Sequence, residues 1–185
     1  MKRRLFLQFP LAVPLLMAHR PAESPEEGER GFKVEAGKDR HGEELLIMGG
    51  KFDCKISSKD TNGAWCLYDT LRWEKGGPRL HLHYEQDEWF YVVKGEFIVK
   101  VGEDQFKLTA GDSAFAPRKV PHAFAKVSEG EAKMLVLFQP AGSMEDFFKQ
   151  MSKLGQDIPK DQDATLKELW RKHGMEIVGP PLKLE

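Results

Sequence analysis

The amino-acid sequence predicts an all-β domain followed by a short helical segment. Strand-like runs follow one another through the centre of the chain, separated by turns such as Gly49-Gly50, Asn62-Gly63 and Gly76-Gly77. No stretch with helical periodicity lies between these runs, which favours a sandwich or barrel over a parallel sheet. The periodicity changes after Pro140, where apolar residues recur at helical spacing.

Ten strand-like runs are expected within residues 32–140. They are 44–48, 52–57, 64–73, 79–84, 88–93, 96–101, 104–108, 113–116, 122–126 and 132–138. Cys54 and Cys66 lie on either side of one turn. The sequence allows a disulfide between them across that hairpin. We favour two small buried apolar residues, because the register of a hairpin cannot be read from sequence.

Residues 141–185 are expected to form a helical extension of one or two helices. The first carries one apolar stripe, made of Met144, Phe147, Phe148, Met151 and Leu154. The second is expected at 163–173, with Leu166, Leu169 and Trp170 inward. We interpret both stripes as packing surfaces against the β-domain or against a second subunit, without a chemical role.

Composition and charge exclude several function classes. The chain of 185 residues has 28 Lys and Arg against 29 Asp and Glu, a formal net charge of -1. Nothing in it is basic enough to follow a phosphate backbone, so we expect no nucleic-acid partner. Hydrophobic residues at 41% and charged residues at 31% fit neither a disordered chain nor a polytopic membrane protein. We therefore expect one folded domain without stable membrane insertion.

The first residues predict export. Residues 1–18 begin with Lys2-Arg3-Arg4 and continue as an apolar stretch that is too short to span a bilayer as a helix. The run 3–8 resembles a twin-arginine signal, although Lys2 stands where Ser or Thr is usual. We expect an exported protein, periplasmic or extracellular. The alternative is a cytoplasmic protein with a frayed basic N-terminal tail whose apolar part packs on the domain. Residues 19–31, rich in Glu, Pro and Gly, are expected to be a flexible lead-in.

Three histidines and one glutamate give the strongest functional signal. His81 and His83 are two residues apart on a predicted strand, so both side chains project from the same face. A hairpin with a tight polar turn would carry Glu88 back across the sheet beside them, and a proline-flanked turn precedes His122. Three imidazoles and one carboxylate suit manganese, iron, cobalt, nickel, copper or zinc, and suit calcium or magnesium poorly.

The spacing of these residues resembles the two sequence motifs of the cupin superfamily. The first motif is matched by His81-x-His83-x4-Glu88-x6-Gly95, and the second by Gly111-x5-Pro117 followed by His122. The sequence departs from the second motif at Lys119, where glycine is usual, and at Lys126, where asparagine is frequent. The glycine that usually opens the first motif is displaced by one position, to Gly76.

The resemblance implies a fold and a set of metal ligands. Cupins are double-stranded β-helix (jelly-roll) barrels, which would here occupy residues 32–140. The likeness makes His81, His83, Glu88 and His122 the ligands of one divalent transition metal ion. It also implies a homodimer, to which the stripe around Phe147 would contribute.

Within the superfamily, residues 81–96 and the Gly-Pro-Pro at 179–181 are most similar to small single-domain quercetin dioxygenase-like proteins. That likeness implies an oxidoreductase, a dioxygenase acting on a small aromatic or polyhydroxylated organic substrate. Glu88 would then be the catalytic residue that takes the substrate proton. Two alternatives stay open: a non-oxidative isomerase or lyase with the same metal, and a cupin that binds a small molecule without turnover.

Strand alternation predicts part of the substrate pocket. Phe90 should share a face with Glu88, and Phe124 should share a face with His122. Phe97 is a further candidate for an apolar lining. Taken individually, each of these three phenylalanines is more often an ordinary residue of the barrel core than part of a substrate pocket.

Overall fold

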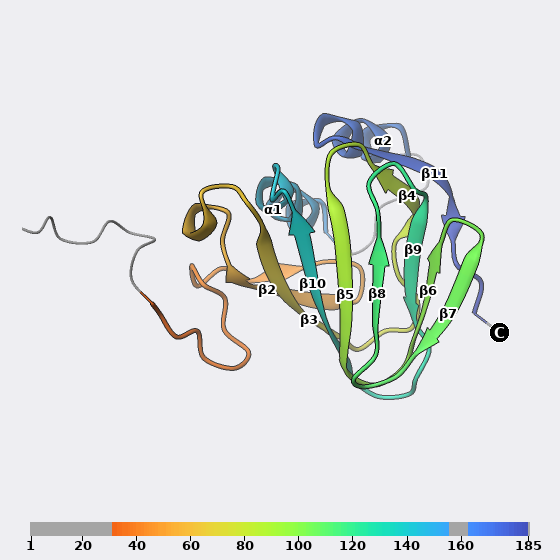
Figure 1. The fold of residues 1–185 in the computed structure, drawn as a ribbon, viewed down its shortest axis with the longest axis horizontal. Coiled ribbons are helices and arrows are strands. Elements are labelled where there is room, and N and C mark those ends of the chain that lie inside the picture. Colours follow the sequence, from red (N-terminus) through yellow and green to blue (C-terminus); the bar gives the residue numbers. More distant parts are fainter. Residues whose placement is uncertain (1–30, 156–162, 185) are drawn as a thin grey trace, which may run out of the picture.

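Two antiparallel sheets form the framework of the computed structural model, which describes residues 31–155 and 163–184 (Figure 1). The first sheet has the strand order β1-β2-β3-β10-β5-β8, and the second has the order β11-β4-β9-β6-β7. The strands are β1 Leu45–Leu46, β2 Gly50–Ile56, β3 Cys66–Arg72, β4 Arg79–His83, β5 Asp87–Lys94, β6 Phe97–Val101, β7 Asp104–Leu108, β8 Ser113–Ala116, β9 His122–Lys126, β10 Ala132–Gln139 and β11 Met175–Pro181. The predicted export signal, and the lead-in except for its last residue, lie outside the described residues.

The first ten strands confirm the predicted all-β fold, and their ends differ from the expected ones by at most two residues. The eleventh strand was not predicted. β11 lies in the segment that was expected to be only helical, and it pairs antiparallel with β4, placing Met175 opposite His83 and Ile177 opposite His81. Its prolines, Pro180 and Pro181, are tolerated because β11 is the outer strand of its sheet.

Aromatic side chains from the two sheets meet in the core. The ring of Phe90 on β5 lies 5.8 Å from that of Phe124 on β9, and Phe97 on β6 lies 6.2 Å from Phe124. On the outer face of β5, Trp89 and Tyr91 stack on each other instead. The inner faces of β5 and β9 therefore point toward each other, as alternation requires.

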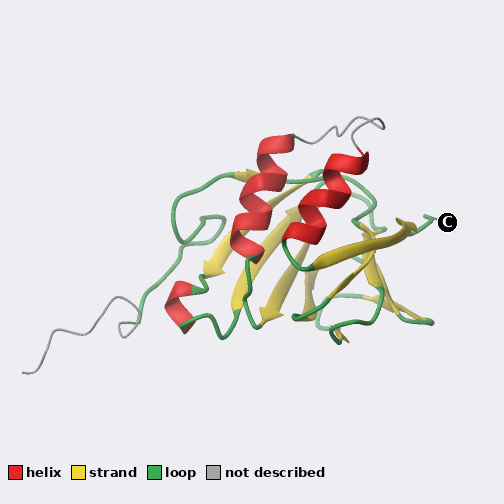
Figure 2. Ribbon diagram, turned by 90° about the horizontal axis from the view of Figure 1, so that it is seen from above, coloured by secondary structure: helices red, strands yellow, loops and turns green. Residues whose placement is uncertain are grey.

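Two helices cover one end of the sheets, α1 (Met144–Leu154) and α2 (Asp163–Lys172), and they lie side by side in Figure 2. The predicted helices are thus present. The apolar stripe of α1 is buried, with Phe147 3%, Phe148 7% and Met151 2% exposed, so the expectation that it forms an exposed dimer surface is wrong. It packs instead on the first sheet and on Trp170 of α2. None of the described helices is long and apolar enough to cross a bilayer.

The two cysteines are free and buried. Cys54 lies opposite Tyr68 and Cys66 lies opposite Phe138, so the hairpin does not bring the two thiols into register. Burial raises the pKa of the Cys54 thiol to about 12, which suppresses the reactive thiolate. Both residues therefore behave as small apolar side chains.

Gly77 lies where two backbone segments of the second sheet approach closely. A Cβ atom at this position would stand 1.9 Å from the carbonyl oxygen of Phe124. We expect Gly77→Ala to lower the free energy of unfolding by about 1–3 kcal/mol, because the backbone must move to relieve the overlap. Chemical denaturation measures this change. Gly31→Ala, where no heavy atom lies within 4 Å, is the control, and equal losses in both variants would contradict the close approach.

Candidate metal centre

The four predicted ligand residues meet at one point between the sheets. His81 and His83 come from β4, Glu88 from β5 and His122 from β9. One donor atom from each residue lies within 4.8 Å of the donor atoms of the other three, and all four side chains are buried. His81 and His122 are direct partners in the β4–β9 pairing, so strand register holds these two imidazoles side by side, with ring centroids 4.5 Å apart.

Glu88 lies between two histidines. Its Oε2 is 2.8 Å from Nε2 of His122 and 3.3 Å from Nε2 of His83. The rings of His83 and His122 are nearly parallel, with centroids 5.4 Å apart. The carboxylate and both Nε2 atoms therefore point at the same small volume.

Backbone carbonyls orient two of the rings. Nδ1 of His81 donates to the carbonyl oxygen of Arg79 at 2.8 Å, and Nδ1 of His122 donates to that of Val120 at 2.9 Å. With the Nδ1 protons placed there, the Nε2 atoms face the centre, which is how metal-binding histidines are held in proteins. Nδ1 of His83 is buried and has no partner among the described residues.

The protonation states also fit a cation. Burial, together with the neighbouring His122 and His83, lowers the pKa of His81 well below its ordinary value, so its lone pair stays free. Burial alone would raise the pKa of Glu88, but the hydrogen bonds from His122 and His83 outweigh it, and the group is a carboxylate. Burial opposes protonation of His122, yet Glu88 raises its pKa. The Nε2 lone pair that attracts a proton would also bind a metal ion in its place. This donor set therefore suits a divalent transition metal.

The loop before His122 is tied to the other ligand strands. Lys119 adopts a left-handed conformation, with φ of 65°, and its backbone N–H donates to the carbonyl oxygen of His83 at 2.7 Å. This conformation explains why the cupin motif usually has glycine here, since a side chain at positive φ is strained. The departure at this position leaves the ligand geometry intact.

Asp87, the residue before Glu88, anchors the same loop. Its carboxylate accepts hydrogen bonds from the backbone N–H of Arg118 at 2.8 Å and from its Nε and Nη2 at 3.0 and 2.7 Å. We expect Asp87→Asn to weaken metal binding by about tenfold, because the loop that positions His122 loses a charged anchor. Titration against a chromogenic chelator measures the affinity. Asp104→Asn removes an exposed carboxylate on β7 as the control; equal affinities for both variants would show that the anchor is dispensable.

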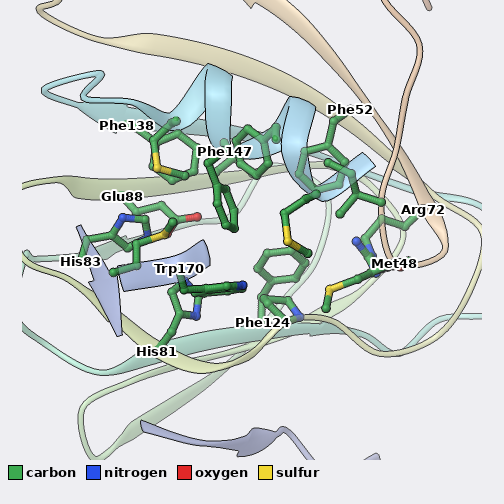
Figure 3. Close-up of a pocket in the computed structure, with 17 residues that line it drawn as sticks. Met48, Phe52, Arg72, His81, His83, Glu88, Phe124, Phe138, Phe147 and Trp170 are labelled. Atoms are coloured by element: carbon green, nitrogen blue, oxygen red, sulfur yellow. Dashed lines mark hydrogen bonds and ion pairs between the residues drawn. The ribbon is translucent and has the colours of Figure 1, made fainter. Parts of the chain in front are cut away.

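An apolar cavity of about 50 Å³ adjoins three of the four residues, His81, His83 and Glu88 (Figure 3). Side chains of both sheets and both helices line it, among them Phe52, Phe124, Phe138, Met144, Phe147, Met151 and Trp170. Of the three predicted pocket residues, Phe124 lines the cavity. Phe90 and Phe97 face inward as expected but are fully buried and do not line the cavity, because the ring of Phe124 contacts both.

Two parts of the cavity could not be predicted from the sequence. Trp170 of α2 packs its edge against His81, with centroids 4.7 Å apart, and Phe147 of α1 stands beside it. Arg72 also lines the cavity. The signal for Arg72 was the alternation of β3, in which Tyr68, Thr70 and Arg72 share one buried face. For the helices, only an amphipathic stripe was visible, which does not say what it covers.

Comparison with known proteins shows which family part of this chain is similar to. Residues 71–138 match the family model of the cupin domain. An uncharacterized protein of Methanocaldococcus jannaschii is 30% identical over 67 residues, which are 36% of this chain and 54% of that protein. An uncharacterized protein of Streptomyces coelicolor is 33% identical over 60 residues, which are 32% of this chain and 56% of that protein. The chain thus spans about half the length of these relatives.

A solved structure shares the fold. An RmlC-like cupin from Shewanella frigidimarina superposes with a TM-score of 0.50 and 28% sequence identity, covering 64% of this chain and 96% of that one. The match of residues 71–138 to the family model and the shared two-sheet fold identify this part of the chain as a cupin domain.

Proposed function

We propose that the protein is a metal-dependent cupin enzyme of the dioxygenase type, acting on a small aromatic or polyhydroxylated molecule. One observation carries this proposal: four buried donor groups converge beside a narrow, largely apolar cavity. Buried polar groups gathered without a bound partner would be unfavourable, whereas a cation with a small organic ligand satisfies them.

His81, His83, Glu88 and His122 would hold the metal, and manganese, iron, nickel, copper, cobalt or zinc would suit them. Such an ion would supply Lewis-acid activation of a substrate oxygen and, for a redox-active metal, electron transfer toward dioxygen.

The chain's own residues would position the substrate and take its proton. Glu88 is held as a carboxylate, and its Oε2 is the basic atom at the centre, within reach of His122 and His83. It is therefore the group to accept a proton from a substrate hydroxyl. The rings of Phe124, Phe138 and Phe147 would orient a planar substrate and keep water away from the carboxylate.

Metal content and oxygen uptake test the proposal together. Protein purified without added metal is analysed for bound ions, reconstituted with each candidate metal, and assayed for oxygen consumption with a panel of flavonols and related enediols, with and without a carboxylate. We expect one metal per chain and oxygen uptake that Glu88→Gln abolishes. Conversion of the substrate without oxygen uptake would favour an isomerase or lyase, and binding without conversion would favour a binding protein. Failure to bind any of these metals would overturn the proposal.

A further inference from the structure

The cavity has a second polar feature apart from the metal centre. Arg72, at the end of β3, lines the cavity with only 2% of its surface exposed. Figure 3 shows Arg72 and Met48 at one end, Glu88 and His83 at the other, and Phe124 between them. Phe124 follows His122 by two residues on β9, so a rise of about 3.3 Å per residue places it about 7 Å along the strand from the centre.

The guanidinium of Arg72 has few partners. Within the described parts of the chain, its hydrogen bond runs from Nη2 to the carbonyl oxygen of Met48, and its buried Nε has none. The group also lies over the face of Phe124, with Cζ 5.5 Å from the ring centroid. No carboxylate of the described residues forms an ion pair with it, although a buried charge normally has such a partner.

Neighbouring charges do not compensate for this cation. Glu74 is exposed and acts on Arg72 only at longer range, and Lys126 is a second buried cation nearby. The ammonium of Lys126 is bonded to the carbonyl oxygen of Ser128 at 2.7 Å. Burial lowers the pKa of Arg72 to about 10, so the guanidinium stays charged at neutral pH.

The surrounding chain leaves room for the guanidinium. Gly50 lies opposite Arg72 in the β2–β3 pairing, and a Cβ there would stand 3.2 Å from Cγ and 3.4 Å from Nη1 of Arg72. An outer depression of about 460 Å³, rimmed by Glu74 and Lys75, shares Arg72 and Met48 with the cavity. Arg72 therefore lies on the boundary between the metal-side cavity and the surface.

We propose that Arg72 binds the carboxylate of the substrate, which is a small organic acid with an oxygen donor at its opposite end and an apolar middle. The planar guanidinium fork matches a carboxylate, the aromatic wall matches the middle, and the metal centre matches the donor. For the substrate's oxygen-donor end this inference rests on the proposed function, and for the substrate's carboxylate end it rests on Arg72 alone.

A pair of probes that differ only in charge tests the inference. 4-Hydroxybenzoate and the uncharged 4-hydroxybenzamide have the same shape, and zinc-loaded protein binds them without redox turnover. Isothermal titration calorimetry should give at least about tenfold tighter binding of the acid, since a hydrogen bond to a charged group is among the stronger ones. Arg72→Gln should remove this preference while the zinc content stays at one per chain.

Two surface variants guard against misfolding of Arg72→Gln. Glu74→Gln removes the exposed negative charge near Arg72, and should tighten binding of the acid about two- to fivefold without changing that of the amide. Lys107→Gln removes an exposed positive charge on β7 and should change neither affinity. If Arg72→Gln does not fold, an unchanged affinity in Glu74→Gln overturns the inference.

The outcomes separate this inference from the proposed function. Equal binding of acid and amide by wild-type protein, or an undiminished preference in Arg72→Gln, overturns the role of Arg72 even if zinc is bound. No detectable binding of 4-hydroxybenzoate also overturns it. If wild-type protein binds none of the candidate metals, the proposed metal centre is wrong, and the same pair of probes on the metal-free protein tests the role of Arg72 alone.

Discussion

Replacing His122 with alanine is expected to abolish stoichiometric metal binding while the two sheets stay folded. His122 lies within hydrogen-bond distance of Glu88 and directly opposite His81, so its loss removes one donor and releases a second. We expect the affinity to fall by at least about a hundredfold, more than the loss of an outer hydrogen bond to a ligand. Elemental analysis after dialysis measures the bound metal, and circular dichroism measures the fold.

The control for this variant is His41→Ala, because His41 is exposed and lies outside the centre. It should retain the full metal content of the wild type. A His122→Ala protein with one metal per chain would show that these four side chains are not the ligand set. An unfolded variant would leave His83→Ala, on the neighbouring strand, as the second measurement of the same ligand set.

Replacing Trp170 with alanine is expected to lower the free energy of unfolding by about 3–5 kcal/mol. The indole is 3% exposed and packs edge-on against both His81 and Phe147, so its removal leaves a hole between α2, α1 and β4. Metal binding should persist, since Trp170 supplies no ligand. Denaturation by urea, followed by circular dichroism, measures the change.

Glu168→Ala, an exposed position on the same helix, separates the packing effect from a change in helix stability. It should alter the free energy of unfolding by no more than about 0.5 kcal/mol. If Trp170→Ala and Glu168→Ala lowered the free energy of unfolding by equally small amounts, α2 would not be packed over the centre as the structure has it.

Most of the fold could be predicted because its signals are local. Turns with glycine, such as Asn62-Gly63, mark strand ends, and alternation marks inner faces. β11 was not predicted, because Gly179-Pro180-Pro181 is typical of a turn and because its partner β4 lies about ninety residues earlier in the sequence. A strand that depends on so distant a partner leaves little trace in its own residues.

The candidate centre could be predicted for the same reason, and the cavity could not. His81 and His83 on β4 and Glu88 on β5 are separated only by a short turn, so their spacing keeps them close together. The predicted hairpin is wrong, however, because β4 and β5 belong to different sheets and do not pair. Alternation also put Phe90 on the inner face, but a face does not reveal which side chain lies nearest to the open space. Trp170 reaches the centre only through the packing of a helix, which depends on the whole tertiary structure.

The pairing of β4 with β11 has a consequence for biosynthesis. β4 carries two of the three imidazoles, yet its pairing with β9 contains a single residue pair, His81 with His122, so β11 provides most of its hydrogen-bonded edge. Because Met175 is synthesised long after His83, the edge of β4 that pairs with β11 remains unpaired during this interval. We therefore expect tight ion binding to require the synthesis of Met175, and a nascent chain halted before this residue should hold no ion tightly.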